Sequence, residues 1–303
     1  MTCIVFPGQG SQSQGMVKDF HDNFKLAVSI FEEIEDYTKL DIRNIIFNDN
    51  NKLNLTQFTQ ICIFSASYAI FKILEVEKGF ENINIMMGHS LGEYTALACS
   101  NKITLKECSL ILKKRGELMS NSVLPNETGM AALIGNDVGT VQKIIENNNL
   151  DLEIANDNSN IQIVISGKLE QINKSKEIFL DNKIKKFIIL NVSAAFHSKF
   201  MLQAQNDLSK DIDKLNLVEN KIKIISNYDA EVHNDNLSIK KNLQYQMANR
   251  VNWTKSVKKL EEIGENKIIE IGPNKVLSGL IRRISSNFDI VSYDKILDLE
   301  LRE

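Results

Sequence analysis

Cysteine and histidine are scarce in this sequence, whose 303 residues include four of each. The cysteines, Cys3, Cys62, Cys99 and Cys108, show no metal-ligand spacing and lie in apolar segments. Cysteines of this kind are typical of small core side chains in a reducing compartment. The sequence therefore predicts reduced cysteines and no metal site.

Long apolar runs are missing. No stretch of 18 or more apolar residues occurs, so the sequence predicts no membrane-spanning helix. The first ten residues, MTCIVFPGQG, lack the basic start and the long apolar segment of a signal peptide. We therefore expect a cytoplasmic protein that has no membrane partner.

An excess of positive charge is also missing, since the net charge is −3. This balance argues against nucleic acid as a partner. Local basic clusters do occur, and the simplest interpretation is that they are solvated helix faces. They lie at residues 113–115, 183–186, 255–259 and 282–283.

Short strands and helices alternate along most of the chain. Apolar segments at 3–6, 83–87, 222–225 and 267–271 predict buried strands. Segments with helical character lie between and after them, at 22–36, 60–78, 104–120, from about 198, and at 239–248, 253–263 and 274–284. This order predicts an α/β protein whose mostly parallel sheet is covered on both faces.

The middle of the chain has a different order of strands and helices. Strands are predicted at 128–134, 152–155, 161–166 and 184–190, with an Asn-rich turn between the second and third. Helices at 137–147 and 169–180 complete a β-α-β-β-α-β order, which is the split pattern of ferredoxin-like units. With Pro125 near its start, this segment predicts a small inserted subdomain at 124–191.

The strongest chemical signal is the pentapeptide Gly88-His89-Ser90-Leu91-Gly92, placed between a strand and a helix. In this G-x-S-x-G arrangement the serine lies on a sharp turn, where larger flanking side chains would clash. The turn also puts Ser90 at a helix N-terminus, so the free N–H of Leu91 can stabilise an oxyanion. The alternative is an ordinary helix start capped by serine.

A nucleophilic serine needs a base, and the candidates are His21, His89, His197 and His233. His89 adjoins Ser90 on the turn, so its side chain is expected to point elsewhere. His21 and His233 lie in polar surroundings and are expected at the surface. His197 follows a strand in a segment of small residues, which makes it the best partner for Ser90.

Taken together, these motifs resemble the malonyl-CoA:acyl carrier protein transacylase family, which includes acyltransferases of polyketide and fatty-acid synthases. The resemblance runs in order over essentially the whole chain. It is carried by Phe6-Pro7-Gly8-Gln9-Gly10-Ser11-Gln12, Gly88-His89-Ser90-Leu91-Gly92-Glu93-Tyr94, Ala195-Phe196-His197-Ser198 and Glu270-Ile271-Gly272-Pro273 with Lys275-Val276-Leu277, supported by Lys114-Arg115-Gly116 and Asn249 to Trp253.

The resemblance implies an α/β-hydrolase-like core with a parallel sheet, formed by 1–123 and 192–303, and a ferredoxin-like subdomain at 124–191. It implies that Ser90 is the nucleophile and His197 the general base and acid. The implied reaction transfers malonyl from malonyl-CoA to the phosphopantetheine thiol of an acyl carrier protein, through an ester on Ser90. No metal or redox cofactor is implied.

The resemblance also assigns supporting roles. The backbone carbonyl of Gln246 orients the histidine in place of a triad carboxylate. Gln9 and the Leu91 N–H form the oxyanion hole. Arg115 binds the malonyl carboxylate, Gln60 lines the acyl pocket, and Phe196 is the bulky residue of malonyl-selective relatives.

The role of Arg115 has a physical basis. A malonyl group carries an anion that is costly to bury unpaired, and a guanidinium can bind it through two parallel hydrogen bonds. A surface helix charge is the alternative for this residue. Phe196 should crowd a 2-methyl branch, and one methyl is worth roughly 1–3 kcal/mol.

Three positions depart from the family pattern. Arg250 stands where proline is usual, Ile61 where a proline often follows Gln60, and Ala194 where His or Gly is common. None of the three removes a catalytic group. Because Arg250 follows Gln246 closely, it bears most on the carbonyl role.

Other functions remain open at this stage. A serine acyl hydrolase would use the same serine and histidine but would gain nothing from Arg115. A non-catalytic docking scaffold would not need the catalytic set. A discrete acyltransferase serving a polyketide synthase would use the same chemistry. For the acidic carrier, 183–186 and 255–259 are candidate docking surfaces, and a monomer is expected.

Overall fold

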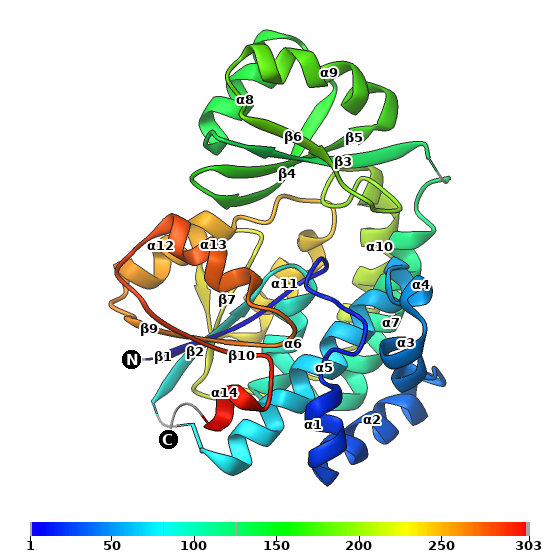
Figure 1. Ribbon diagram of the computed structural model, residues 1–303, viewed down its shortest axis with the longest axis vertical. Coiled ribbons are helices and arrows are strands. Elements are labelled where there is room, and N and C mark those ends of the chain that lie inside the picture. Colours follow the sequence, from blue (N-terminus) through cyan, green and yellow to red (C-terminus); the bar gives the residue numbers. More distant parts are fainter. Residues whose placement is uncertain (1, 81, 125, 301–303) are drawn as a thin grey trace.

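A computed structural model describes residues 2–80, 82–124 and 126–300, so the predicted boundary residue Pro125 lies outside the described part (Figure 1). In this part, six strands form one sheet and four form another. The larger sheet has the order β10 (Asp289–Tyr293), β9 (Lys267–Ile271), β1 (Thr2–Phe6), β2 (Ile83–Gly88), β7 (Lys223–Ile225), β8 (Val232–His233). Its neighbouring strands are parallel except for β7 and β8, which confirms the predicted parallel sheet.

Helices cover both faces of the larger sheet, because its strands are apolar on both sides. In β1, Ile4 and Phe6 face the larger hydrophobic cluster, while Cys3 and Val5 face a second cluster. The first face carries α5 (Thr56–Glu77), α6 (Leu91–Cys99) and α7 (Leu105–Ser120), and the second carries α12 (Trp253–Glu262) and α13 (Val276–Ile284). Together with the larger sheet these helices form the larger part of the molecule. Its remaining helices are α1 (Lys18–Asn23), α2 (Lys25–Thr38), α3 (Ile42–Asn48), α4 (Asn50–Leu53), η1 (Lys199–Met201), α10 (Leu202–Ile212), α11 (Asn236–Gln246) and α14 (Leu297–Glu300).

Helix α5 is the one described helix long and apolar enough to span a membrane by length and composition. However, 83% of its most apolar window is buried inside the protein. Its contacts with α2, α6 and α7 are those of a central core helix.

The smaller sheet lies above the larger one in Figure 1 and has antiparallel neighbours throughout. Its order is β4 (Leu152–Ser159), β5 (Gln162–Lys168), β3 (Thr128–Ile134), β6 (Lys186–Ile189), with α8 (Val138–Asn147) and α9 (Leu169–Asp181) in the connections. Alternation along β3 explains the packing. Ala131 and Leu133 pack with α8 and α9, whereas Met130 and Ala132 join the core of the larger part.

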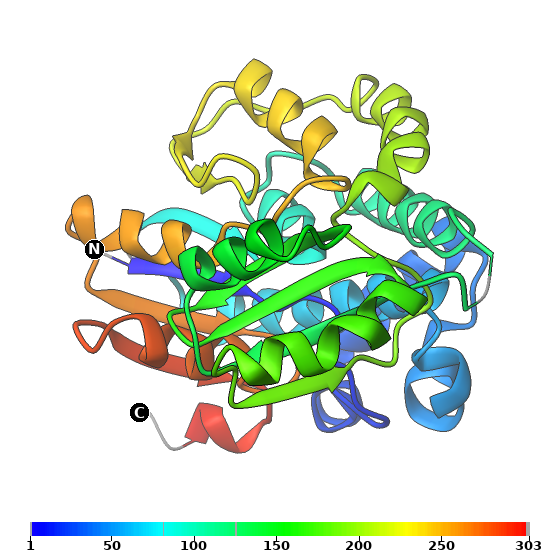
Figure 2. The same cartoon turned by 90° about the horizontal axis from the view of Figure 1, so that it is seen from above.

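Backbone hydrogen bonds also join β4 of the small sheet to the loop between α11 and α12, away from the points where the chain crosses. Val251 forms a parallel bridge with Asn156, and backbone hydrogen bonds link it to Ala155 and Asp157. Viewed from above, α8 and α9 lie on the outer side of the small sheet (Figure 2). The inner side of the small sheet therefore faces the carboxyl ends of β1 and β2.

Several predicted boundaries were wrong. The helix predicted at 22–36 is two helices, because Phe24 has an extended backbone between α1 and α2. The Asn-rich turn is confined to residues 160–161, since Asn156 and Asn158 are buried strand residues of β4. The short elements α3, α4, α14, β8 and β10 were not predicted.

Glycines at the end of β2 and in the first turn of α6 permit a close approach of backbone segments. Phe6 of β1 pairs in register with Gly88 of β2, so both strands end at the same edge. A Cβ atom on Gly92 would lie 2.2 Å from the Phe6 carbonyl oxygen, and one on Gly88 would lie 2.0 Å from the Gly92 carbonyl carbon. Only glycine fits at these two positions.

We expect Gly92→Ala to lower the midpoint of thermal unfolding sharply, because its methyl group would collide with backbone that cannot move away. Gly279→Ala in α13 is the matched control, since a Cβ there has no neighbour within 4 Å. Replacing that helical glycine should stabilise the protein by about 0.5–1 kcal/mol. Equal melting temperatures for the two variants would contradict this account.

Candidate active site

Ser90 lies at the sharp turn between β2 and α6. Its backbone angles, φ 54° and ψ −108°, place it in a strained conformation for a residue with a side chain. The hydroxyl points into a small cavity of about 90 Å³, which Gln9, Gln60, Arg115, Phe196 and His197 also line. The predicted serine turn is thus present, and the predicted residues from distant parts of the chain meet around it.

His197 faces Ser90 in the geometry that proton transfer requires. The distance between Ser90 Oγ and His197 Nε2 is 2.9 Å. The other ring nitrogen, Nδ1, lies 3.0 Å from the Gln246 carbonyl oxygen and 3.1 Å from that of Asn249. Because carbonyl oxygens only accept, Nδ1 carries the proton in the neutral ring and Nε2 is free to accept one from Ser90.

The electrostatic surroundings keep His197 neutral. Burial is the main cause, and the nearby Arg115 charge is the second, of a His197 pKa lowered to about 3. A neutral imidazole can act as a general base without first losing a proton. His197 Nε2 is therefore free of a proton over a wide range of pH.

Arg115 is buried, with 1% of its surface exposed, so the interpretation as a surface helix charge was wrong. Its Nη1 donates to Gln60 Oε1 over 2.6 Å, and its Nη2 donates to Ser90 Oγ and Gln246 Oε1 over 3.0 Å each. No ion pair between Arg115 and a carboxylate occurs within the described residues. The site thus holds a cation whose hydrogen-bond partners are all neutral.

The two groups expected to form an oxyanion hole lie beside Ser90. Leu91 is the first residue of α6, so its N–H has no partner within the helix. Gln9 follows the end of β1 and donates through Nε2 to Thr56 Oγ1 over 3.2 Å. Both residues line the cavity that contains the Ser90 hydroxyl.

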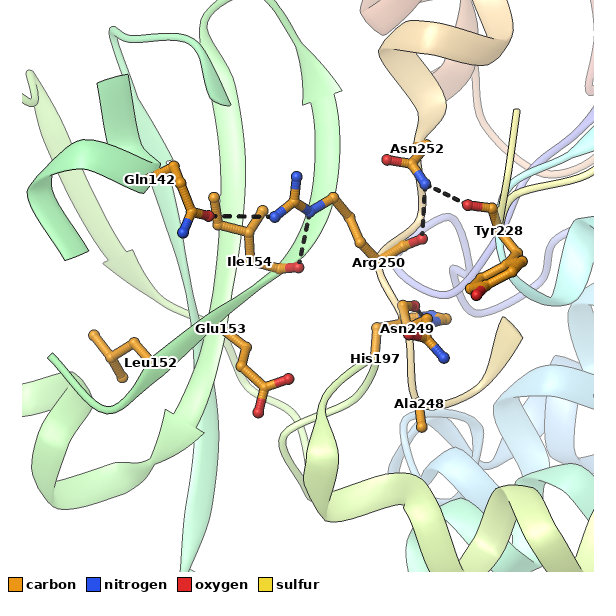
Figure 3. A pocket seen from close by; sticks show the side chains of 10 residues that line it. All are labelled: Gln142, Leu152, Glu153, Ile154, His197, Tyr228, Ala248, Asn249, Arg250 and Asn252. Carbon is orange, nitrogen blue, oxygen red and sulfur yellow. Dashed lines mark hydrogen bonds between the residues drawn. The ribbon is translucent and has the colours of Figure 1, made fainter. Parts of the chain in front are cut away.

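A second cavity, of about 420 Å³, lies on the other side of His197 between β4 and the loop 248–252 (Figure 3). Arg250 crosses it, and its Nε donates to the Ile154 carbonyl oxygen over 3.3 Å. The residue that replaces the usual proline thus ties the loop to the small sheet. The Gln246 carbonyl remains within hydrogen-bond distance of His197.

The remaining histidines do not touch Ser90 Oγ. His89 points away, as expected, with Nε2 2.8 Å from Asn158 Oδ1. His21 and His233, expected at the surface, are partly buried, with side chains 18% and 16% exposed. His21 packs against Phe31 and Phe47, and His233 bonds Asp229.

Sequence reasoning missed two buried residues beneath Ser90. Asn227 accepts the Ser90 N–H through Oδ1 over 2.6 Å, and it lies in a loop without any motif. Glu93 accepts from Gln246 Nε2 over 2.7 Å. Burial raises the pKa of Glu93 to about 7. Its only sequence signal was its place in the Gly88–Tyr94 motif.

Residues 3–294 match the family model of the acyl transferase domain. The chain belongs to this family. It is 33% identical to the malonyl CoA-acyl carrier protein transacylase of Bacillus subtilis, over 98% of this chain and 95% of that protein. It is 35% identical to the polyketide biosynthesis malonyl CoA-acyl carrier protein transacylase PksC of the same organism, over 95% and 98%.

A solved structure gives the same result. The chain superposes with a TM-score of 0.94 on a malonyl-transacylase in complex with its type II PKS acyl-carrier protein, PlMCAT:AntF. The two are 29% identical, and the match covers 99% of this chain and 97% of that one. The chain is an acyltransferase with the α/β fold of its family, as the motifs predicted.

We expect the His197 ring to remain neutral down to about pH 5 in the free protein. An ordinary histidine, with a pKa of about 6.5, would be about 97% protonated there. Arg115→Ala removes one of the charges that lower the pKa of His197, so the ring should titrate at higher pH in that variant. Nitrogen NMR titration measures the protonation of the His197 ring in wild type and in Arg115→Ala.

His233 provides an internal control in the same spectra. Its hydrogen bond to Asp229 raises its pKa above the usual value, and it should titrate alike in both proteins. A wild-type His197 that titrates near pH 6.5 would contradict the lowered pKa expected for this ring.

Proposed function

We propose that this acyltransferase moves malonyl groups from malonyl-CoA to the phosphopantetheine thiol of an acyl carrier protein. The observation that carries the proposal is the placement of Arg115, a buried cation 3.0 Å from Ser90 Oγ in a cavity of about 90 Å³. Such a site suits a short acyl group that ends in a carboxylate. A neutral acyl chain would leave the cation uncompensated.

In the first step, Ser90 Oγ attacks the thioester carbonyl carbon while its proton passes to His197 Nε2. The carbon–sulfur bond breaks, and the thiol of coenzyme A leaves with that proton. In the second step, the carrier thiol gives its proton to His197 and attacks the malonyl ester. Ser90 Oγ leaves and takes the proton back. Ping-pong kinetics should result.

The surrounding residues take the roles that their positions allow. The Leu91 N–H and the Gln9 side chain stabilise the oxyanion. The Gln246 carbonyl holds the Nδ1–H tautomer of His197. Gln60 supports Arg115 through its Oε1, and Phe196 lines the cavity where a 2-methyl branch would lie.

We interpret the two parts of the fold as two subdomains of this enzyme. Residues 1–123 and 192–303 would form an α/β-hydrolase-like catalytic core around Ser90. Residues 124–191 would form a ferredoxin-like subdomain, an interpretation supported by the strand order β4-β5-β3-β6. The active site then lies where the two meet. We further infer a cytoplasmic monomer that uses malonyl-CoA as substrate and needs no cofactor.

A polyketide carrier is a second candidate client. The chain is about equally similar to the two Bacillus subtilis relatives, of which one is named for polyketide biosynthesis. Both relatives are named as malonyl CoA-acyl carrier protein transacylases, so the chemistry proposed for Ser90 and Arg115 is the same for either client.

Carrier docking is expected beside the groove that leads to Ser90. A hollow of about 620 Å³ lined by residues 189–193 shares Leu190 and Val192 with the Ser90 cavity. Lys185 and Lys186 are exposed at the start of the edge strand β6, whose other end, Ile189, lines the hollow, and they form no ion pair within the described residues. In the 255–259 cluster, Lys259 is already paired with Glu231 and Glu262. We therefore favour the 183–186 cluster.

To test the function, wild type, Arg115→Ala and Ser90→Ala are each mixed with malonyl-CoA, methylmalonyl-CoA or acetyl-CoA and followed by intact mass. Wild type should form a malonyl adduct and pass it to a carrier protein, with malonyl preferred. Arg115→Ala should lose that preference by about 100-fold, since a buried charge pair is broken. Ser90→Ala should form no adduct.

Two results would count against the proposal. A wild type that prefers acetyl-CoA would have a different specificity. Release of free malonate faster than transfer to the carrier would make the protein a hydrolase.

For docking, we expect the double charge reversal Lys185→Glu and Lys186→Glu to raise the apparent KM for the carrier by about 10-fold. Adduct formation from malonyl-CoA should stay at the wild-type rate. The matched control reverses Lys255 and Lys258, which are exposed on α12. If adduct formation and transfer to the carrier slow equally, or if the control variant has the larger effect on the carrier KM, the carrier does not dock at residues 183–186.

A further inference from the structure

One buried carboxylate oxygen connects the groups that hold the active site together. Glu93, in the first turn of α6, is 1% exposed and touches neither the Ser90 hydroxyl nor the His197 ring by any hydrogen bond in the described residues. Its Oε2 accepts from Gln246 Nε2 over 2.7 Å and from the Asn227 N–H over 3.0 Å. The family chemistry derived above leaves this acid without a role.

The two residues that donate to Glu93 support the backbone of Ser90 through their side-chain amides. Asn227 Oδ1 accepts the Ser90 N–H over 2.6 Å, and its Nδ2 donates to the Gly88 carbonyl oxygen over 2.7 Å. Gln246 Nε2 donates to the Ser90 carbonyl oxygen over 2.9 Å. Both peptide groups of this strained residue are therefore bound by side chains of two residues that donate to Glu93, Gln246 through its side-chain amide and Asn227 through its backbone N–H.

Gln246 extends the connection to Arg115 and His197. Its Oε1 accepts from Arg115 Nη2 over 3.0 Å, and its backbone carbonyl accepts from His197 Nδ1 over 3.0 Å. The side-chain amide of Gln246 can bond Arg115, the Ser90 carbonyl oxygen and Glu93 in one orientation only. If it were reversed, its NH₂ would face the Arg115 donors and its oxygen would face the acceptors of Ser90 and Glu93.

We propose that Glu93 is a positioning residue, whose carboxylate fixes the Gln246 side chain and the Asn227 backbone and thereby sets the geometry of Ser90, His197 and Arg115. This rests on the proposed function for the identity of the acyl group, but not for the positioning itself. The reach of the side chain matters more than its charge, because the two hydrogen bonds that Oε2 accepts are what hold the Gln246 side chain and the Asn227 backbone in place.

Two conservative variants separate reach from charge. Glu93→Asp keeps the charge but withdraws the oxygen by one methylene, so at least one of the hydrogen bonds from Gln246 Nε2 and the Asn227 N–H is lost. Glu93→Gln loses the charge but can present its amide oxygen in the same place. We expect Glu93→Asp to react about 100-fold more slowly than wild type, as misplacement by about 1 Å can cause, and Glu93→Gln to stay within about 10-fold.

The readout is the rate at which Ser90 is labelled by a fluorophosphonate probe, per folded molecule. This probe needs an activated serine but no acyl-CoA. The malonyl-CoA to acetyl-CoA preference of adduct formation is measured alongside, and it should fall in Glu93→Asp because Arg115 loses its support. A wild type that labels well but does not take malonyl would overturn the proposed function and leave the positioning test intact.

Glu270 provides the matched control. It is also a fully buried acid whose oxygens accept two backbone N–H groups, those of Leu277 and Ser278, over 2.8 and 2.7 Å. Glu270→Asp and Glu270→Gln should lower the melting temperature but keep the labelling rate and the acyl preference. The positioning role is overturned if both Glu93 variants label within two-fold of wild type, or if Glu93→Gln is the slower of the two.

Discussion

The arrangement of the site depends on Ser90 being held in a strained backbone conformation at the end of a parallel strand. Its N–H and carbonyl oxygen are bound by the side chains of Asn227 and Gln246. Those amides come from the loop after β7 and from the end of α11. The strain at this one residue is therefore maintained by contacts that exist only in the folded chain.

The Arg115 charge is the second constraint, and it affects both the binding of an anionic substrate and the protonation of His197. Three neutral oxygens bind the guanidinium, one of them the Ser90 hydroxyl. The same charge lowers the pKa of His197, next to burial as the main cause. A group placed to bind an anionic substrate thus also keeps the base unprotonated.

Selectivity and reactivity meet in Gln246. Its backbone carbonyl faces His197, and its side chain joins Arg115, Ser90 and Glu93. One residue at the end of a helix therefore couples the base, the cation and the nucleophile. The Gln246 carbonyl takes the place of a catalytic carboxylate at His197 Nδ1. The buried acid, Glu93, reaches His197 only through Gln246.

The sequence alone determined the parallel α/β arrangement, the serine turn and the choice of His197, because strand and helix periodicity and the glycines around Ser90 are local properties. It could not determine that Arg115 is buried, since a Lys-Lys-Arg run on a helix has the same pattern at a surface. Nor could it find Asn227, or the function of Glu93. Those depend on which side chains the packing brings beneath Ser90, from segments more than 100 residues apart.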